Sequence, residues 1–273
     1  MPERSSLLHL MARIRYGGIP WLATALRTRL WPTSPSLAPG AVNATRDRIG
    51  LEIGGPSRIF ARKNILPVYP EAKRIDNVNF ASRTAWETGL KDEGEFVFNP
   101  AKPPGRQFLR EATHLDGIPD GAYDFVLSSH CLEHLANPIA ALREWARVTR
   151  DGGHLLLILP DPRATFDHRR PLTTINHLRQ DFARNTGEDD LTHLPEIVAL
   201  HNLALDRHAG SPEQFRSRCA LNRENRCMHH HVFDLELMRE ILRETGWSVV
   251  DAERVRPIHL VALAQKGDLV PHS

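Results

Sequence analysis

The sequence has few cysteines, and they form no recognisable pattern. Only Cys131, Cys219 and Cys227 occur among 273 residues, and an odd number of cysteines cannot all pair within one chain. The spacing Cys-x-x-Cys is absent, and no apolar run followed by a small-residue cleavage site precedes these cysteines. This argues against a disulfide-stabilised secreted domain, and we expect a protein of the reducing cytoplasm.

Long apolar runs and an excess of one charge sign are also missing. No stretch of about 18 apolar residues occurs, so the sequence predicts no membrane-spanning helix. Lysine and arginine total 35 against 33 acidic residues, a formal net charge of +2. This balance lacks the basic excess typical of nucleic-acid binding, so we expect no nucleic-acid partner. With 41% hydrophobic and 25% charged residues, the composition is that of an ordinary folded domain.

The basic charge that is present gathers at the N-terminus. Residues 1–48 hold seven arginines and two acidic residues, and apolar side chains alternate with the arginines over Ser6–Trp31. One interpretation is an amphipathic helix that contacts an anionic inner membrane surface. The favoured alternative is a helix packed on the rest of the chain. Because Trp31–Thr45 is rich in Pro, Ser, Thr and Ala, it is expected to be a linker, which makes residues 1–45 an extension.

Beyond this extension, apolar strands alternate with helical patterns. The clearest unit is a strand at Tyr123–Ser129, a helix capped by Asn137 and a strand at Leu155–Leu159. A further helix should begin after Asp234 and end near Glu244. Further strands are expected at Ile49–Ile53, Ala72–Ile75, Gln107–Glu111, Trp247–Val255 and His259–Ala264. This order predicts an α/β fold with a mostly parallel sheet, formed by residues 46–160 and completed by residues 232–268.

The segment between these two parts has a different composition. Residues 161–231 contain eight of the fifteen histidines and no long apolar strand. We expect short helices and loops there, inserted before the last helix and strand pair. An insertion at this point should lie above the carboxyl ends of the strands, where open α/β sheets bind ligands.

The turn after the first expected strand is the first candidate binding site. It reads Glu52-Ile53-Gly54-Gly55-Pro56-Ser57, and its glycines would let the backbone approach a ligand. Because the pattern is not Gly-x-Gly-x-x-Gly, a dinucleotide cofactor is disfavoured. Asp76 follows Gly54 by 22 residues, a suitable spacing for accepting hydrogen bonds from ribose hydroxyls. An ordinary glycine turn and a solvated aspartate are the structural alternatives.

Together these segments resemble a known family. The run YDFVLSSHCLEHLANPIAALREWARVTRDGGHLLLILPD, residues 123–161, resembles class I S-adenosylmethionine-dependent methyltransferases of the type 11 kind. The stretches GLEIGGPS and EATHL resemble the glycine turn and the adenine-binding step of that family. The resemblance implies a Rossmann-like, seven-stranded, mostly parallel sheet with an inserted α-rich cap. It also implies S-adenosylmethionine as the cofactor.

The resemblance assigns roles residue by residue. Glu52, Gly54, Gly55 and Ser57 would surround the methionine part of the cofactor, and Asp76 would hold its ribose. The adenine would be bordered by Glu111, Ala112 and Thr113, while Ser129 and His130 would face both the cofactor and the methyl acceptor.

A looser resemblance concerns the methyl acceptor. The string DPRATFDHRRPLTTINHLRQDF, residues 161–182, is similar to an insertion in bacterial methyltransferases associated with sugar and polysaccharide loci. It implies O-methylation of a carbohydrate or glycoconjugate. A hydroxyl needs a base, and the candidates are His130, Asp161, Asp167, His168 and His177, of which His130 and Asp161 lie at the ends of expected strands. A small metabolite, a lipid head group or a non-catalytic module remain alternatives, and the oligomeric state is left open.

The histidines also raise the question of a metal site. His229 and His231 would share one face of an extended segment, and His130 and His134 are four residues apart. Residues 161–231 contain no Cys-x-x-Cys or His-x-x-x-His spacing, and the family pattern already accounts for His130 and His134. The sequence therefore predicts no metal.

Overall fold

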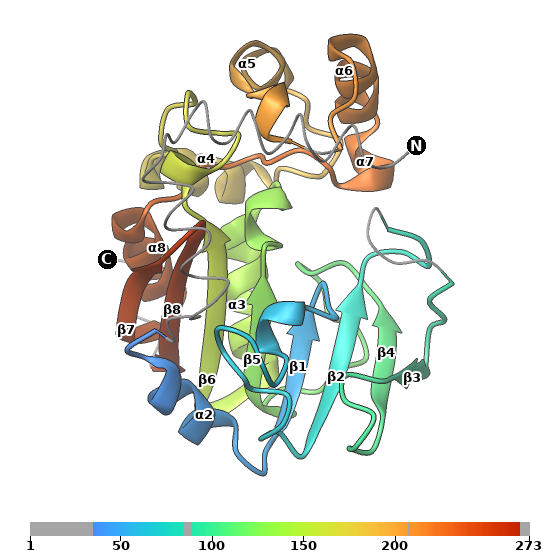
Figure 1. The fold of residues 1–273 in the computed structure, drawn as a ribbon, viewed down its shortest axis with the longest axis vertical. Coiled ribbons are helices and arrows are strands. Elements are labelled where there is room, and N and C mark those ends of the chain that lie inside the picture. The colour runs from blue at the N-terminus through green and yellow to red at the C-terminus, as the bar shows by residue number, and fades with distance from the viewer. Residues whose placement is uncertain (1–34, 85–88, 207, 268–273) are drawn as a thin grey trace.

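The protein forms one mixed, mostly parallel sheet. A computed structural model describes residues 35–84, 89–206 and 208–267. Within these ranges eight strands are ordered β3-β4-β2-β1-β5-β6-β8-β7 (Figure 1). Their bounds are β1 Ile49–Ile53, β2 Arg74–Asn79, β3 Gly94–Phe96, β4 Gly105–Leu109, β5 Tyr123–Ser129, β6 Thr149–Pro160, β7 Trp247–Val255 and β8 His259–Lys266.

The directions of the strands confirm the predicted fold class. The strands β4, β2, β1, β5 and β6 pair in parallel, while β8 runs antiparallel to both β6 and β7. The sheet has one strand more than the seven predicted, because Gly94–Phe96 pairs antiparallel with the edge strand β4. Three residues without an apolar alternation carry too little signal to be predicted as a strand.

The second strand is longer than predicted. The expected strand ended before Asp76, but β2 continues to Asn79 and pairs with the whole of β1. Leu51 lies opposite Asp76, and Ile53 lies opposite Val78. Asp76 is therefore inside the strand, and Asn79 occupies its carboxyl end.

Both faces of the sheet are covered, as a parallel sheet requires. In β6, Leu155 and Leu157 point to a core that includes the helices α3 (Pro138–Val148) and α8 (Leu235–Glu244). The alternate residues Leu156 and Ile158 point to a second core on the opposite face. The predicted caps are confirmed, since Asn137 and Asp234 accept hydrogen bonds from the first turns of α3 and α8.

The second core includes a helix that the sequence analysis missed. Helix α2 (Ala38–Thr45) buries Ala41 and Ala44 against the sheet. The prediction of a linker is wrong for these residues, because small alanines pack closely although they give no strong amphipathic pattern. The expected amphipathic helix at Ser6–Trp31 lies outside the described residues.

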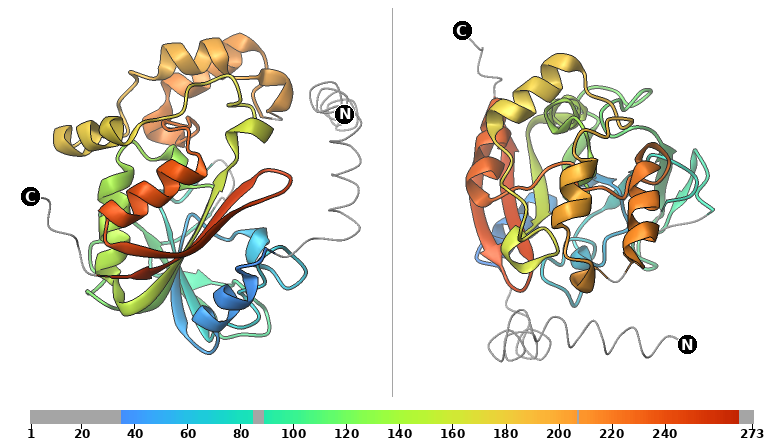
Figure 2. Two further views of the ribbon diagram at one scale, coloured as in Figure 1. Left: turned by 90° about the vertical axis from the view of Figure 1, so that its left-hand side faces the viewer. Right: turned by 90° about the horizontal axis from the view of Figure 1, so that it is seen from above.

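Residues 161–231, called the cap below, cover the carboxyl ends of the parallel strands (Figure 2). The cap has its own small core, in which Ile197, Phe215, Cys219 and Met228 are buried together. Its α-helices are α4 (Ile175–Arg184), α5 (Leu194–Leu200), α6 (Pro212–Ala220) and α7 (Asn222–Asn225). Across the described ranges, no helix has the length and apolar character needed to cross a membrane.

Candidate functional site

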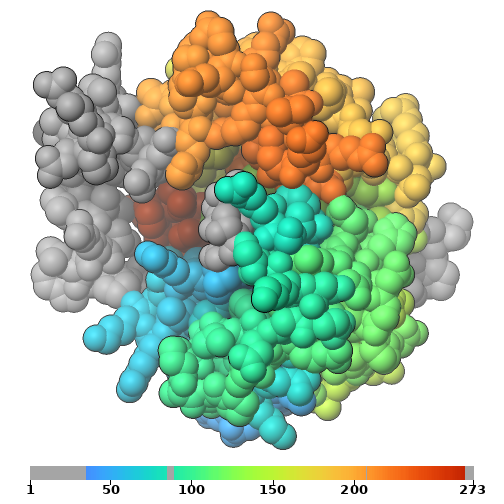
Figure 3. Space-filling view, turned by 90° about the vertical axis from the view of Figure 1, so that its right-hand side faces the viewer, coloured from blue at the N-terminus to red at the C-terminus, as the bar shows by residue number. Residues whose placement is uncertain are grey.

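A cavity of about 670 Å³ lies between the sheet and the cap. In the space-filling view, the orange cap lies across the top of the blue and green core, and the surface is hollowed between them (Figure 3). This volume is in the range of cofactor and ligand sites. Six of the residues expected at the site line the cavity: Gly54, Ser57, Glu111, Ala112, Ser129 and His130.

The turn after β1 brings backbone to the cavity wall. Gly54 has φ of +81°, a conformation that favours glycine, and its N–H donates to Val78 O at 2.8 Å. Gly55 is held by Asn77, which accepts from its N–H at 3.0 Å and donates to its carbonyl at 3.2 Å. The turn is therefore attached to β2 and presents an open backbone face to a ligand.

Glu52 supports this turn from below and does not line the cavity. A Cβ on Gly55 would lie 2.3 Å from the Glu52 Cδ, so glycine is required above this side chain. The Glu52 carboxylate accepts hydrogen bonds from Tyr69 Oη at 2.6 Å and from Ser57 N at 3.0 Å. Burial raises the pKa of Glu52 to about 7. Glu52 therefore shapes the turn, because its carboxylate accepts the hydrogen bond that the Ser57 N–H donates.

Asp76 also lies outside the cavity lining. Its carboxylate accepts hydrogen bonds from Tyr123 Oη and Arg106 N, both at 2.9 Å, and Arg74 Nε lies 3.0 Å away. The ribose role expected for Asp76 follows from its spacing to Gly54 and its place just after the expected strand Ala72–Ile75, whereas the longer β2 puts Asp76 inside the strand. Asn79 lines the cavity instead, and its Nδ2 donates to Gly55 O at 3.1 Å.

The loop after β4 forms another wall of the cavity. Ala112 is anchored by Trp145, whose Nε1 donates to the Ala112 carbonyl at 2.9 Å. Glu111 reaches the cap, where Arg226 Nη2 lies 2.5 Å from its Oε1. Thr113 does not line the cavity, and its hydroxyl lies 3.2 Å from His114 Nδ1. The structure thus places two of the three expected adenine contacts at the cavity.

His130 lies at the carboxyl end of β5 and lines the cavity. Its φ is +51°, and its N–H donates to Ile158 O at 2.9 Å. The side chain is 31% exposed, with Nδ1 3.5 Å from Glu133 Oε1 and Nε2 2.9 Å from His259 Nδ1. Among the candidate bases, His130 and Asp167 line the cavity, whereas Asp161, His168 and His177 do not.

Asp161 and His168 lie outside the cavity lining. Asp161 accepts hydrogen bonds from Arg163 Nη2 at 2.8 Å and from the Arg163 N–H at 3.1 Å. His168 Nδ1 lies 3.0 Å from Thr165 O. These local contacts hold both side chains outside the cavity lining. The structure gives neither residue a place beside the reacting atoms.

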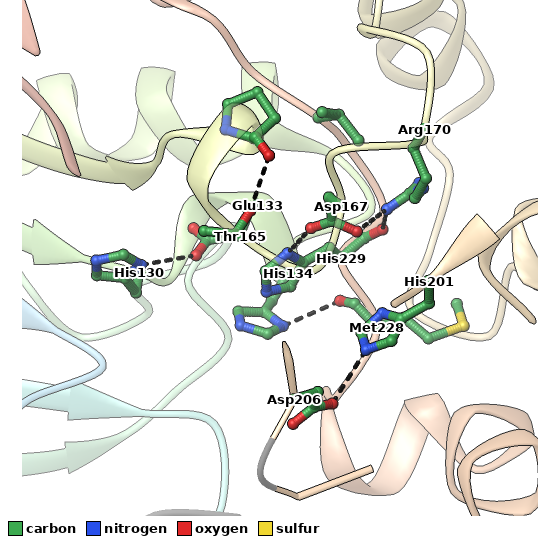
Figure 4. A network of polar contacts seen from close by, with 12 residues as sticks. His130, Glu133, His134, Thr165, Asp167, Arg170, His201, Asp206, Met228 and His229 are labelled. Atoms are coloured by element: carbon green, nitrogen blue, oxygen red, sulfur yellow. Dashed lines mark hydrogen bonds and ion pairs between the residues drawn. The ribbon is translucent and has the colours of Figure 1, made fainter. Parts of the chain in front are cut away.

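A group of buried ionisable side chains forms the part of the cavity wall where β5 meets the cap (Figure 4). Glu133 and His134 belong to the 3-10 turn Leu132–His134 after β5 and are 1% and 8% exposed. Asp167 and His229 come from the two ends of the cap, and His229 Nδ1 lies 2.6 Å from Asp167 Oδ2. Arg170 completes the group, with Nη1 3.1 Å from Asp167 Oδ1.

The charges in this group depend on one another. Burial alone would lower the pKa of His229, but the neighbouring Asp167 carboxylate outweighs burial and raises it. Burial alone would raise the pKa of Glu133, but the surrounding His130, His134 and His229 outweigh it and lower it. For His134, burial dominates and lowers the pKa to about 4. Burial alone would raise the pKa of Asp167, but His229 and Arg170 outweigh it and lower it, so at neutral pH the group holds two buried carboxylates.

The sequence analysis named most of these residues without assembling them. Asp167 is among the candidate bases, and His134 and His229 are considered there as possible metal ligands. The only sequence signal for this buried group was the number of ionisable residues near both ends of residues 161–231. Their convergence depends on the path of the cap, which no local pattern specifies.

The fold and the cavity define the class of the protein. A parallel sheet of this order, with a glycine turn after β1 and a ligand cavity at the carboxyl ends of its strands, is that of the class I S-adenosylmethionine-dependent methyltransferases. A family model described as a methyltransferase domain matches residues 23–252. The chain therefore belongs to the methyltransferase domain family, whose cofactor is S-adenosylmethionine.

Individual relatives are distant. An uncharacterized methyltransferase of Mycobacterium sp. (strain JLS) is 28% identical over 143 residues, which cover 52% of this chain and 48% of the relative. The chain thus matches about half the length of this curated relative.

Solved structures of similar proteins have low sequence identity. A SAM-dependent methyltransferase from Aquifex aeolicus is 14% identical, covering 88% of this chain and 93% of that one, with a TM-score of 0.44. The Burkholderia thailandensis 1,6-didemethyltoxoflavin N1-methyltransferase, solved with bound 1,6-didemethyltoxoflavin and S-adenosylhomocysteine, is 14% identical. It covers 93% of this chain and 90% of that one, with a TM-score of 0.43.

Proposed function

We propose that this protein transfers the methyl group of S-adenosylmethionine to a hydroxyl oxygen of a carbohydrate or glycoconjugate. The observation that carries the proposal is the cavity itself. Its sheet side has the open glycine turn of a cofactor site, and its cap side is rich in ionisable and polar side chains. An acceptor held there would lie between the cofactor and the buried group around Glu133.

The residues on the sheet side fit the cofactor. Gly54 offers unobstructed backbone, Asn79 offers a polar side chain at the end of β2, and Ala112 leaves room for a flat ring. Arg226 lies over the Phe80 ring, with its Cζ 5.0 Å from the ring centroid, and closes this part of the cavity from the cap. S-adenosylmethionine would supply an activated methyl group on a sulfonium sulfur.

His130 is the base that we assign to the reaction. The His130 imidazole would take the proton of the acceptor hydroxyl as that oxygen receives the methyl group, and the carbon–sulfur bonding pair would leave with S-adenosylhomocysteine. Glu133 lies 3.5 Å from His130 Nδ1 and would stabilise the imidazolium that forms. The products are the methyl ether, S-adenosylhomocysteine and the proton on His130.

Two features favour a carbohydrate as the acceptor. The cap contributes Asp206, Arg218 and Asn225 to the cavity, and such side chains match the many hydroxyl donors and acceptors of a sugar. In addition, residues 161–182 resemble the insertion found in methyltransferases of sugar and polysaccharide loci. A hydroxyl acceptor also explains the presence of a base beside the cofactor, because an alcohol must lose a proton on methylation.

Calorimetric titration with S-adenosylhomocysteine, followed by acceptor screening with methyl-labelled cofactor, tests the proposal. We expect S-adenosylhomocysteine binding and label transfer to nucleotide sugars or glycoconjugates. His130→Gln should retain binding and lose about 10²-fold or more in turnover. His154→Gln is the matched control, because His154 lies in β6 outside the cavity lining. Transfer only to lipid head groups or small amines would contradict the acceptor, and absent cofactor binding would contradict the activity.

A further inference from the structure

Three side chains in the cavity wall offer metal-ligand atoms at one point. One ligand atom each from Glu133, His134 and His229 lies within 4.8 Å of the other two. All three residues are buried and all three line the cavity. Because metal–ligand bonds are about 2.0–2.2 Å long, small side-chain rotations would bring these atoms around one ion.

Both histidines are oriented by a second layer of contacts. His229 Nδ1 lies 2.6 Å from Asp167 Oδ2, and His134 Nδ1 lies 3.0 Å from Met228 O. When Nδ1 donates its proton to an oxygen, Nε2 on the other side of the ring carries the lone pair. Carboxylate and carbonyl partners of this kind are typical of metal-binding histidines.

Glu133 supplies an independent observation. Its side chain is 1% exposed, yet neither carboxylate oxygen accepts a hydrogen bond in the described part of the chain. The His130 imidazole is close by, with its Nδ1 3.5 Å from Oε1. A buried carboxylate without hydrogen bonds is costly, and coordination of a cation is one of the few arrangements that compensate for it.

We propose that Glu133, His134 and His229 bind a divalent transition-metal ion whose remaining coordination positions face the cavity. Two imidazoles and one carboxylate are the ligand set of open catalytic sites for Zn²⁺ and Fe²⁺. The inference reverses the sequence-based prediction of no metal, which considered the histidines of each segment separately. The ligands come from the turn after β5 and from the end of the cap.

The role of the ion builds on the proposed function. A cation here would bind the acceptor hydroxyl and lower its pKa, so that its proton passes to His130 more easily. Glu133 and His134 follow His130 by three and four residues in the chain. Two of the metal ligands therefore lie beside the base. The ion would also fix the cap on the core, because His229 belongs to the cap and the other two ligands to the core.

A second histidine cluster is the internal comparison. One ligand atom each from His177, His193 and His231 also lies within 4.8 Å of the others, outside the cavity lining. There, His177 Nε2 is only 3.0 Å from His193 Nε2, so a hydrogen bond already pairs two of the three residues. His177 is also 35% exposed. These contacts make the second cluster a matched control for the first.

The metal content of protein purified without a histidine tag provides the test. After chelation with EDTA, the protein is titrated with Zn²⁺ by calorimetry and with Co²⁺ by visible absorption. We expect about one ion per chain, and Glu133→Gln and His229→Gln should each weaken binding about 10–100-fold. His177→Gln should bind the ion as the wild type does. A thermal shift of the wild type on Zn²⁺ addition gives a readout that needs no variant.

Several results would overturn the proposal. The first is a wild-type protein that contains no metal and binds neither Zn²⁺ nor Co²⁺. The second is metal binding that is lost in His177→Gln and kept in Glu133→Gln. S-adenosylhomocysteine titration of the same samples separates the two hypotheses. If the protein binds both metal and cofactor but methylates no carbohydrate, the metal site stands and the proposed acceptor fails. If carbohydrate methylation continues in metal-free protein, the activity stands and the metal's role fails.

Discussion

Asp167 Oδ2 and His229 Nδ1 lie 2.6 Å apart, although 62 residues separate them in the chain. The contact joins the beginning and end of the cap and fixes the orientation of the His229 ring. Asp167→Asn should therefore lower methyl transfer about 10–100-fold. Asp181→Asn is the control, because Asp181 lies 3.2 Å from His177 outside the cavity. Steady-state rates and S-adenosylhomocysteine affinity should be measured together, and equal loss of activity in both variants would contradict the prediction.

Two residues of β2, Asn79 and Asp76, are alternative contacts for the cofactor, and substitutions distinguish them. Asn79→Ala should weaken S-adenosylhomocysteine binding about tenfold, since Asn79 lines the cavity and its side chain holds the Gly55 carbonyl. Asp76→Asn should leave affinity unchanged and lower the free energy of unfolding by about 1–3 kcal/mol, because it weakens the contacts to Tyr123 and Arg106. Calorimetry and urea denaturation measure the two effects. Loss of affinity in Asp76→Asn alone would restore the ribose role of Asp76.

Glu52 should make stability depend on pH. Its pKa is raised from 4.5 to about 7 because burial disfavours the charged form. The folded state therefore binds the proton more tightly than the unfolded state. The resulting stabilisation is complete below pH 4.5 and is lost as pH rises through 7, by up to about 3 kcal/mol.

Glu52→Gln tests this dependence, since glutamine resembles the neutral acid. The difference in free energy of unfolding between wild type and variant should change across pH 4.5 to 7 and be constant above it. Urea denaturation at several pH values measures the difference. A difference that does not vary with pH would show that Glu52 keeps an ordinary pKa.

Gly55 should be required for cofactor binding as well as for stability. In Gly55→Ala, the new Cβ would meet the Glu52 carboxylate at 2.3 Å, and the turn beside the cofactor must move. Gly50→Ala is the matched control, because its Cβ would meet the Phe125 ring at 2.1 Å inside the sheet. Both variants should lose about 1–3 kcal/mol of stability. At a temperature where both remain folded, only Gly55→Ala should lose S-adenosylhomocysteine affinity, and equal loss would refute a local role.

The Glu111–Arg226 pair should hold the cap over the cofactor. Arg226 is 9% exposed at its side chain and also lies 2.9 Å from Glu188. Glu111→Gln and Arg226→Gln should each speed dissociation of S-adenosylhomocysteine, and the double variant should add little to either. A double-mutant cycle from stopped-flow rates measures this coupling, expected at about 1–2 kcal/mol. Additive effects would mean that the two residues act separately.

Local sequence patterns predicted most strands of the sheet. Strands β1, β5 and β7 have the predicted bounds, and Asn137 and Asp234 cap helices as expected. Apolar alternation and capping depend on neighbouring residues, so they are visible in the sequence. Weak patterns failed, as the short strand Gly94–Phe96 and the alanine-rich α2 show. The end of β2 was misplaced because the buried polar residues Asp76, Asn77 and Asn79 interrupt its apolar signal.

The sequence determined the α/β class, the glycine turn and the position of His130 at a strand end, because each depends on residues close together in the chain. Only the tertiary structure decided that Glu52 lies beneath Gly55, and that Asp76, Asp161 and His168 lie outside the cavity lining. It also brought Glu133, His134 and His229 to one point. These relationships depend on strand register and on the path of the cap, where contacts between distant residues determine which side chains meet.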